Sequence, residues 1–256
     1  MRQELRIFLT ALMFYTRIPC PKWVDHSEDY INKATRYFPL IGWIVGGFNA
    51  VIIYACSFIF PISICAIMAL ATSVLLTGAV HEDGFADVCD GFGGGWTKHQ
   101  ILEIMKDSRV GTFAVVGLIL LLSLKVFAII TLLDFELLFT VKSIVLAHVL
   151  SRWSATTIIY THNYSRDDGS SKVKPIAKKL TLTNLIVASL WVIPCLILFQ
   201  SWLILLVIPI VYGTKEYLVN YFEKWINGYT GDCLGATQQI NEIVTLLFCL
   251  VIWKFI

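Results

Sequence analysis

Long apolar runs make up most of this sequence, and they decide which kinds of fold the chain can adopt. A helix needs about 20 mostly apolar residues to cross the roughly 30 Å hydrocarbon layer of a bilayer. Runs of this kind lie at 37–60, 62–80, 110–133, 137–160, 180–199, 202–221 and 243–256, the last extended backwards by an amphipathic turn near Asp232. The sequence therefore predicts an all-α, polytopic membrane helix bundle with about seven spans.

The composition argues against a soluble fold. Hydrophobic residues make up 57% of the 256-residue chain and charged residues 15%, whereas a soluble domain carries about 25% charged residues. The net charge of +2 is too small to indicate a nucleic-acid partner, and the seven cysteines form no Cys-x-x-Cys pair that would suggest a zinc site. We expect residues 1–256 to form one integral-membrane domain surrounded by lipid, with an amphipathic interfacial or re-entrant helix over residues 1–18.

The distribution of lysine and arginine predicts how the chain lies in the membrane. Basic residues gather near the N-terminus and in four polar segments, 17–36, 81–109, 161–179 and 222–242, whereas the three tight corners between the other spans carry none. Because cytoplasmic loops are enriched in basic residues, we expect the N-terminus and all four polar segments on the cytoplasmic side of the cell inner membrane. The sequence leaves open whether the chain forms a homo-oligomer.

A carboxylate-rich stretch follows the second expected span, where residues 81–91 read His-Glu-Asp-Gly-Phe-Ala-Asp-Val-Cys-Asp-Gly. Asp83, Asp87 and Asp90 have the spacing i, i+4, i+7, which places them on one face of a helix. Three carboxylates on one face repel each other unless a cation holds them. Hard oxygen ligands favour Mg²⁺, or Mn²⁺, over zinc. We interpret the stretch as a metal site; the alternative is a solvated acidic loop.

A second polar cluster lies at 103–109 and offers further ligands. Glu103 and Asp107 are again four residues apart, so with the first stretch they could hold two metal ions. Lys106 and Arg109 would lie beside them as phosphate clamps. The alternative is an ordinary charged surface helix, and Glu103 is the weakest member of the set.

Four more residues are candidates for substrate binding. Arg152 lies about two turns from the cytoplasmic end of its expected span and can face the metal site. Arg166 belongs to a polar, glycine-containing segment that either closes over substrate or is a solvated connection. Thr230 and Asp232 are natural N-caps for the last helix, whose free N–H groups could instead bind a phosphate. For Lys125 and Lys142, a structural ion pair or snorkelling is the better interpretation.

Four ordered blocks resemble the adenosylcobinamide-GDP ribazoletransferase family, also called cobalamin synthases. They lie at 16–19 with 38–42, 81–91, 102–111 and 230–236, so the resemblance runs nearly from end to end. One departure is Gln239, which stands where many members of that family carry an acid; we assign it no role.

The resemblance implies the last assembly step of cobalamin and a dependence on Mg²⁺. In that step a hydroxyl of α-ribazole, or of its 5′-phosphate, attacks the cobinamide-linked phosphorus of adenosylcobinamide-GDP, and GMP leaves. Asp83 would then be a catalytic metal ligand and His81 a candidate general base. On a straight helix the two lie nearly opposite each other, so either Gly84 or a break redirects the chain, or His81 contacts phosphate instead. The residues expected to contact phosphate or guanosine are Lys106, Arg109, Arg152 and Arg166.

Two other functions compete with this interpretation. A CDP-alcohol phosphotransferase uses similar chemistry, but its motif continues Asp-Gly with Ala-Arg, whereas Asp90-Gly91 is followed here by Phe-Gly-Gly-Gly. A cation or proton transporter would have acidic residues in mid-span and often an internal repeat. Here the acidic residues cluster at one surface, and we see no repeat.

Overall fold

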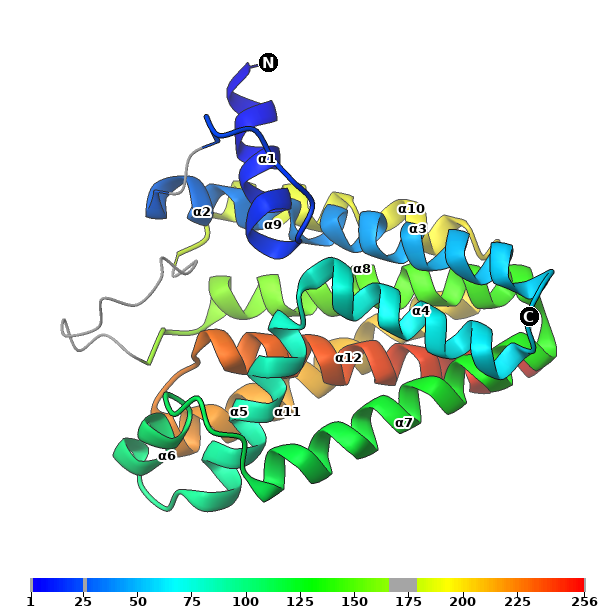
Figure 1. Ribbon diagram of the computed structural model, residues 1–256. Helices are drawn as coiled ribbons and strands as arrows, with labels where there is room; N and C mark the ends of the chain where they lie inside the picture. Colours follow the sequence, from blue (N-terminus) through cyan, green and yellow to red (C-terminus); the bar gives the residue numbers. More distant parts are fainter. Residues whose placement is uncertain (1, 25–26, 166–178, 256) are drawn as a thin grey trace.

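The computed structural model describes residues 2–24, 27–165 and 179–255, and within these ranges the chain is helical with no β-strand (Figure 1). One isolated bridge pairs Tyr164 with Tyr229. The helices of the first half are α1 (Arg2–Tyr15), α2 (Glu28–Ala34), α3 (Phe38–Ser57), α4 (Ile62–Thr77), α5 (Val80–Gly94), α6 (Lys98–Ile104) and α7 (Thr112–Phe135). The second half contains α8 (Leu137–Thr161), α9 (Leu182–Leu190), α10 (Ile193–Ile197), α11 (Val207–Ile226) and α12 (Gly231–Ile252). The prediction of an all-α membrane helix bundle is confirmed.

Helix α8 lies at the centre of the bundle, between α3 and α12 (Figure 1). It is buried along most of its 25 residues, including the polar side chains of Ser143, Ser151, Ser154 and Thr156. Their hydroxyls bond mainly to carbonyls one turn back, as Thr156 does to Arg152 at 2.9 Å, so they need no water. A helix enclosed by other helices can therefore carry many polar residues within a membrane protein.

The expected count of seven spans is not confirmed. Four helical stretches of the described chain are long and apolar enough to cross a membrane, and the bent pair α4–α5 makes a fifth. The expected span 137–160 exists as the 25-residue helix α8 but is not among these apolar stretches. The expected span 180–199 is broken into α9 and α10, because the ring of Pro194 clashes with the carbonyl of Leu190, where α9 ends.

The break between α4 and α5 redirects the chain by 90°. Gly78 and Ala79 both adopt left-handed backbone conformations, with φ of 68° and 58°. The N–H of Ala79 donates to the carbonyl of Val74 at 2.9 Å, a bond that ends α4 as a left-handed C-terminal motif does. Helix α5 therefore runs across the bundle instead of continuing the span (Figure 1).

Helix α1 also lies across the direction of the long helices (Figure 1). It buries Ile7 and Ala11 against α3, and at its end the ring of Tyr15 stacks on Phe38 with centroids 4.0 Å apart. Helices α2 and α6 and the start of α12 lie at the same end of the bundle as α1, while the α3–α4 and α7–α8 corners lie at the other end. The described parts of the polar segments thus gather at one end of the molecule.

Candidate active site

The predicted aspartate stripe is present on α5. The helix is continuous from Val80 to Gly94, so Asp83, Asp87 and Asp90 share one face. Asp83 is exposed, while Asp87 and Asp90 are half-buried. Asp83 has neither a hydrogen bond nor an ion pair from its side chain to any residue that the structure describes. Its carboxylate is therefore available to a ligand.

Glycines bring the start of α12 close to this stripe. A Cβ placed on Gly84 would lie 3.0 Å from Cα and 3.1 Å from the carbonyl oxygen of Asp232. In the same way, a Cβ on Gly235 would lie 3.2 Å from the carbonyl oxygen of His81. The two backbones can approach so closely only because both positions lack a side chain. Asp232 thereby becomes a neighbour of the aspartate helix.

Asp90 also has a structural role, because its carboxylate binds backbone N–H groups at the start of α7. Its Oδ2 accepts a hydrogen bond from the N–H of Gly111 at 2.6 Å, and its Oδ1 accepts one from the N–H of Ala114 at 2.9 Å. These N–H groups begin α7, where a negative charge is favoured by the free donors and by the helix dipole. Asp90 thus fixes α5 to the first turn of α7.

The second polar cluster differs from the expected charged helix face. Helix α6 ends at Ile104, so Glu103 is helical while Asp107 lies in the turn that follows. Glu103 is exposed and 3.6 Å from Nδ1 of His99. Asp107 accepts hydrogen bonds from Nε and Nη2 of Arg109 at 2.8 and 2.5 Å, and these bonds lower the pKa of the Asp107 carboxyl. Lys106 is exposed.

The start of α12 is built as the sequence predicts. The hydroxyl of Thr230 accepts a hydrogen bond from the N–H of Cys233 at 3.3 Å, which makes it the N-cap. The carbonyl of Asn163 accepts from the N–H of Tyr229 at 3.1 Å, and Ser165 donates to the carbonyl of Tyr229 at 2.8 Å. The end of α8 is thereby tied to the start of α12. Arg166 follows directly but lies outside the described residues.

His81 and Asp83 lie on opposite sides of α5. His81 is 6% exposed, and its ring centroid is 5.7 Å from that of Phe38 on α3. No break or turn at Gly84 redirects the helix between them. The guanidinium of Arg152 lies 5.6 Å from the same Phe38 ring, so His81 and Arg152 share the buried side of α5.

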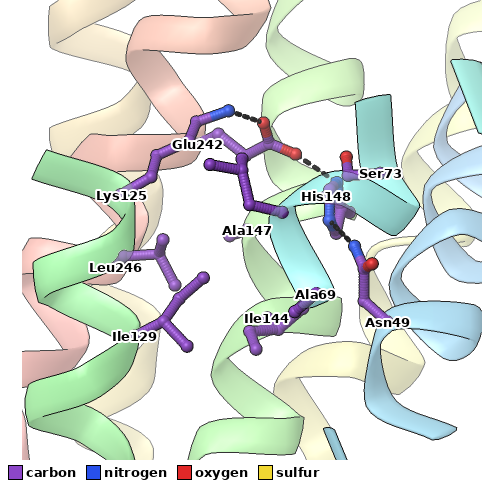
Figure 2. A pocket seen from close by; sticks show the side chains of 11 residues that line it. Asn49, Ala69, Ser73, Lys125, Ile129, Ile144, Ala147, His148, Glu242 and Leu246 are labelled. Atoms are coloured by element: carbon purple, nitrogen blue, oxygen red, sulfur yellow. Dashed lines mark hydrogen bonds and ion pairs between the residues drawn. The ribbon is translucent and has the colours of Figure 1, made fainter. Parts of the chain in front are cut away.

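Glu242 of α12 is the centre of a buried charge network that the sequence analysis missed (Figure 2). Its carboxylate binds Nζ of Lys125 at 2.5 Å and Nδ1 of His148, and Nη1 of Arg152 lies 3.8 Å away. Asn49 contacts the other ring nitrogen of His148 at 2.7 Å. A cavity of about 30 Å³, enough for one water molecule, is lined by Asn49, Lys125, His148 and Glu242 together with apolar side chains. Lys125 thus forms the structural pair that its mid-span position indicated.

A glutamine connects this network to α5. Gln239 accepts a hydrogen bond from Nζ of Lys125 at 2.5 Å and donates one to Glu82 at 3.0 Å. Glu82 precedes Asp83 in the sequence but is 6% exposed. Gln239 therefore has a structural role here. The signal for it was available, because Gln239 and Glu242 are one turn apart in a helix that is otherwise mostly apolar.

A preformed metal cage is not present in the part of the chain that the structure describes. No three histidine, cysteine, aspartate or glutamate side chains there are grouped so that they could hold one ion. The three α5 aspartates share one helix face, and the backbone of Asp232 lies against Gly84 of the same helix.

Comparison with known proteins places the chain in a family. Residues 7–250 match the family model described as cobalamin-5-phosphate synthase. A protein of Shewanella amazonensis is 42% identical over 255 residues, 99% of this chain and 98% of that protein, and it is named adenosylcobinamide-GDP ribazoletransferase. A protein of Shewanella oneidensis with the same name is 39% identical over 250 residues, 98% of this chain and 95% of its own length. No solved structure matches the chain. The chain belongs to the cobalamin-5-phosphate synthase family.

Proposed function

We propose that the chain is an adenosylcobinamide-GDP ribazoletransferase, which performs the last assembly step of cobalamin at the cytoplasmic face of the cell inner membrane. One observation carries the proposal: the family match covers residues 7–250 of a chain whose α5 presents aspartates beside the start of α12. The gathering of the polar segments at one end of the bundle supports the orientation, because nucleotide substrates are found in the cytoplasm.

The proposed reaction is a phosphoryl transfer. The oxygen of an α-ribazole hydroxyl, or of the corresponding hydroxyl of its 5′-phosphate, forms a bond to the cobinamide-linked phosphorus of adenosylcobinamide-GDP. The phosphoanhydride bond between this phosphorus and the GMP phosphate breaks, and its electron pair leaves with GMP. The hydroxyl proton passes to a base. Cobalamin, or its 5′-phosphate, GMP and one proton are the products.

The donors on α5 suit Mg²⁺, with Mn²⁺ as a substitute. Mg²⁺ usually takes one or two carboxylates together with substrate phosphates and several waters, so it needs no preformed protein cage. Asp83 and Asp87 would hold it from α5, and Asp232, whose backbone lies against Gly84, would join them. When bound, the ion would neutralise charge on the diphosphate and on the departing GMP.

The other predicted metal ligands, Asp90 and Asp107, already have hydrogen-bond partners, so they would bind the metal in addition to or instead of these partners. Asp90 keeps lone pairs beyond the two that accept from the first turn of α7. Asp107 and Arg109 would separate, so that the carboxylate faces the ion while the guanidinium binds phosphate together with Lys106. Glu103, exposed on α6, is the outermost of the set.

On the buried side of α5, His81 and Arg152 are the proposed proton acceptor and phosphate contact. His81 would accept the proton of the attacking hydroxyl from between α5 and α3, next to Phe38. Arg152 would contact a phosphate oxygen from the same side. Thr230 and Asp232 would bind substrate at the start of α12, and Arg166, which lies outside the described residues, stays a predicted substrate contact.

The purified chain in lipid nanodiscs tests the proposal directly. With Mg²⁺, adenosylcobinamide-GDP and α-ribazole, we expect GMP and cobalamin in equal amounts, and no GMP when Mg²⁺ is chelated. Release of CMP from a CDP-alcohol instead, or ion flux across liposomes without nucleotide turnover, would overturn it. A parallel assay with α-ribazole 5′-phosphate identifies the preferred acceptor.

A further inference from the structure

Arg17 lies at the point where α5, the aspartate helix, begins. The residue follows the end of α1, and its N–H donates to the carbonyl of Leu76 in the last turn of α4 at 2.7 Å. Its side chain lies over the α4–α5 break: a Cβ placed on Gly78 would be 2.9 Å from Cζ and 3.0 Å from Nη2 of Arg17. The bare α-carbon of Gly78 therefore leaves room for the guanidinium.

The backbone around Arg17 is firmly held. The hydroxyl of Thr16 donates to the carbonyl of Leu12 at 2.6 Å and accepts from the N–H of Ile18 at 3.2 Å. Just before it, Tyr15 stacks on Phe38, which in turn contacts the ring of His81 on α5. The position of Arg17 is thus fixed relative to α5.

Arg17 and Asp83 are both exposed, and neither is paired. Asp83 lies one turn into α5, with its N–H bonded to the carbonyl of Ala79 at 2.8 Å. Among the residues that the structure describes, neither side chain has a hydrogen-bond or ion-pair partner. By contrast, the neighbouring surface cations Lys33 and Arg36 are paired with Asp29 and Glu4. A free guanidinium and a free carboxylate thus stand near the same helix start.

We propose that Arg17 binds the diphosphate of the nucleotide substrate at the start of α5, opposite a metal ion on Asp83. The inference rests on the proposed function, and it adds a binding residue from the segment that follows α1 to a site otherwise built from α5, α6 and α12. A guanidinium presents parallel N–H donors that match two phosphate oxygens, and it remains charged at any physiological pH. The negative charge of the diphosphate would then be compensated on one side by the guanidinium and on the other by the metal ion that Asp83 holds.

The experiment compares Arg17→Ala, Arg17→Lys and Gly78→Ala with the wild-type chain in nanodiscs. The matched control is Lys22→Ala, which removes an exposed cation from the same segment. In Arg17→Ala, we expect the KM for adenosylcobinamide-GDP to rise about 10- to 100-fold, as for a lost charge-assisted hydrogen bond. The KM for α-ribazole should stay at the wild-type value, because a general folding defect would change both constants. Arg17→Lys should recover part of the loss.

Gly78→Ala keeps the charge of Arg17 but places a methyl group where its guanidinium lies. We expect the same selective rise in KM for the nucleotide substrate as in Arg17→Ala. Binding of inorganic pyrophosphate in the presence of Mg²⁺, measured by calorimetry, needs no turnover. It should weaken at least about tenfold in both variants and remain unchanged in Lys22→Ala.

The outcomes separate the two proposals. If the wild-type chain releases no GMP but binds pyrophosphate through Arg17, the proposed function fails while the phosphate site stands. If GMP release is normal and Arg17→Ala retains wild-type KM and pyrophosphate affinity, the phosphate site is refuted and the proposed function stands. A loss that is equal for both substrates in Arg17→Ala and Gly78→Ala would also refute a direct contact.

Discussion

Two adjacent residues of α5, Glu82 and Asp83, belong to regions that differ in whether their charges are compensated. Glu82 faces the bundle interior, where Gln239 connects it to Lys125 and Glu242. Asp83 faces outward and has no partner among the described residues. The interior combines two acids, Glu82 and Glu242, with two basic residues, Lys125 and Arg152. A low-dielectric interior tolerates charges only when they compensate each other, whereas an uncompensated carboxylate at the surface can bind a cation.

Asp83→Ala should produce the largest effect on catalysis. The side chain is exposed and unpaired, so its removal leaves packing intact but takes a ligand from the proposed metal site. We expect GMP release to fall by about 10⁴-fold, because metal assistance contributes several kcal/mol to phosphoryl transfer. Expression and the unfolding midpoint should match the wild type. Asp134→Ala, an exposed aspartate at the α7–α8 corner, is the control, and activity near wild type in Asp83→Ala would contradict the metal-site assignment.

Glu242→Gln should produce the opposite pattern, with stability as the main loss. It leaves Lys125 and Arg152 buried without their shared carboxylate, which costs about 3–5 kcal/mol for comparable buried pairs. Unfolding by a denaturing detergent measures this loss.

The double variant Lys125→Met/Glu242→Gln sharpens the test of the network. Because the two charges are lost together, we expect it to be more stable than the sum of the single effects by about 1–3 kcal/mol. Lys142→Met is the control, since this half-buried lysine has no ion pair in the described chain. Strictly additive single effects would show that the 2.5 Å pair does not couple the helices.

Asp90 is half-buried on the aspartate stripe and, like the residues of the interior network, has hydrogen-bond partners. Asp90→Ala removes both acceptors from the first turn of α7, so we expect a loss of about 1–2 kcal/mol in stability. The same detergent unfolding assay applies, with Asp83→Ala as the matched control on the same helix face. An unchanged unfolding midpoint in Asp90→Ala would mean that the contact with α7 contributes nothing.

The sequence predicts the local features of this molecule well. Apolar runs indicate membrane helices, and the spacing of Asp83, Asp87 and Asp90 indicates a helical stripe, because both patterns depend only on neighbouring residues. The Thr230 cap is predicted for the same reason. The count of seven spans is not confirmed, and α8 illustrates the difficulty, because its many polar residues are accommodated by the helices that enclose it.

Long-range packing explains what the sequence does not predict. Glu82 and Asp83 are indistinguishable in a list of acidic residues, and only the contact of α5 with α12 buries one and exposes the other. The network around Glu242 joins residues from α3, α7, α8 and α12, and its contacts Asn49–His148 and Lys125–Glu242 link positions that are 99 and 117 apart in the chain. Asp107 and Arg109 lie in the short segment between the end of α6 at Ile104 and the start of α7, and there they pair with each other.

The smallest expected effect concerns Asp107, a half-buried acid outside the interior network that is nevertheless paired, with Arg109. Hydrogen bonds from Arg109 lower its pKa, so the stabilising contribution of the pair is present above the ordinary carboxyl pKa and disappears as the pH falls through the lower folded-state value. At neutral pH the pair is fully formed and does not titrate. Arg109→Met should raise the pKa of Asp107 back towards its ordinary value, as measured by carbon-detected NMR titration of labelled aspartate, with Lys106→Met as the neighbouring control. If the pKa of Asp107 stays low in Arg109→Met, a group other than Arg109 keeps its carboxylate ionised. The Asp107–Arg109 pair would then not have to separate at a cost before the two residues bind metal and phosphate.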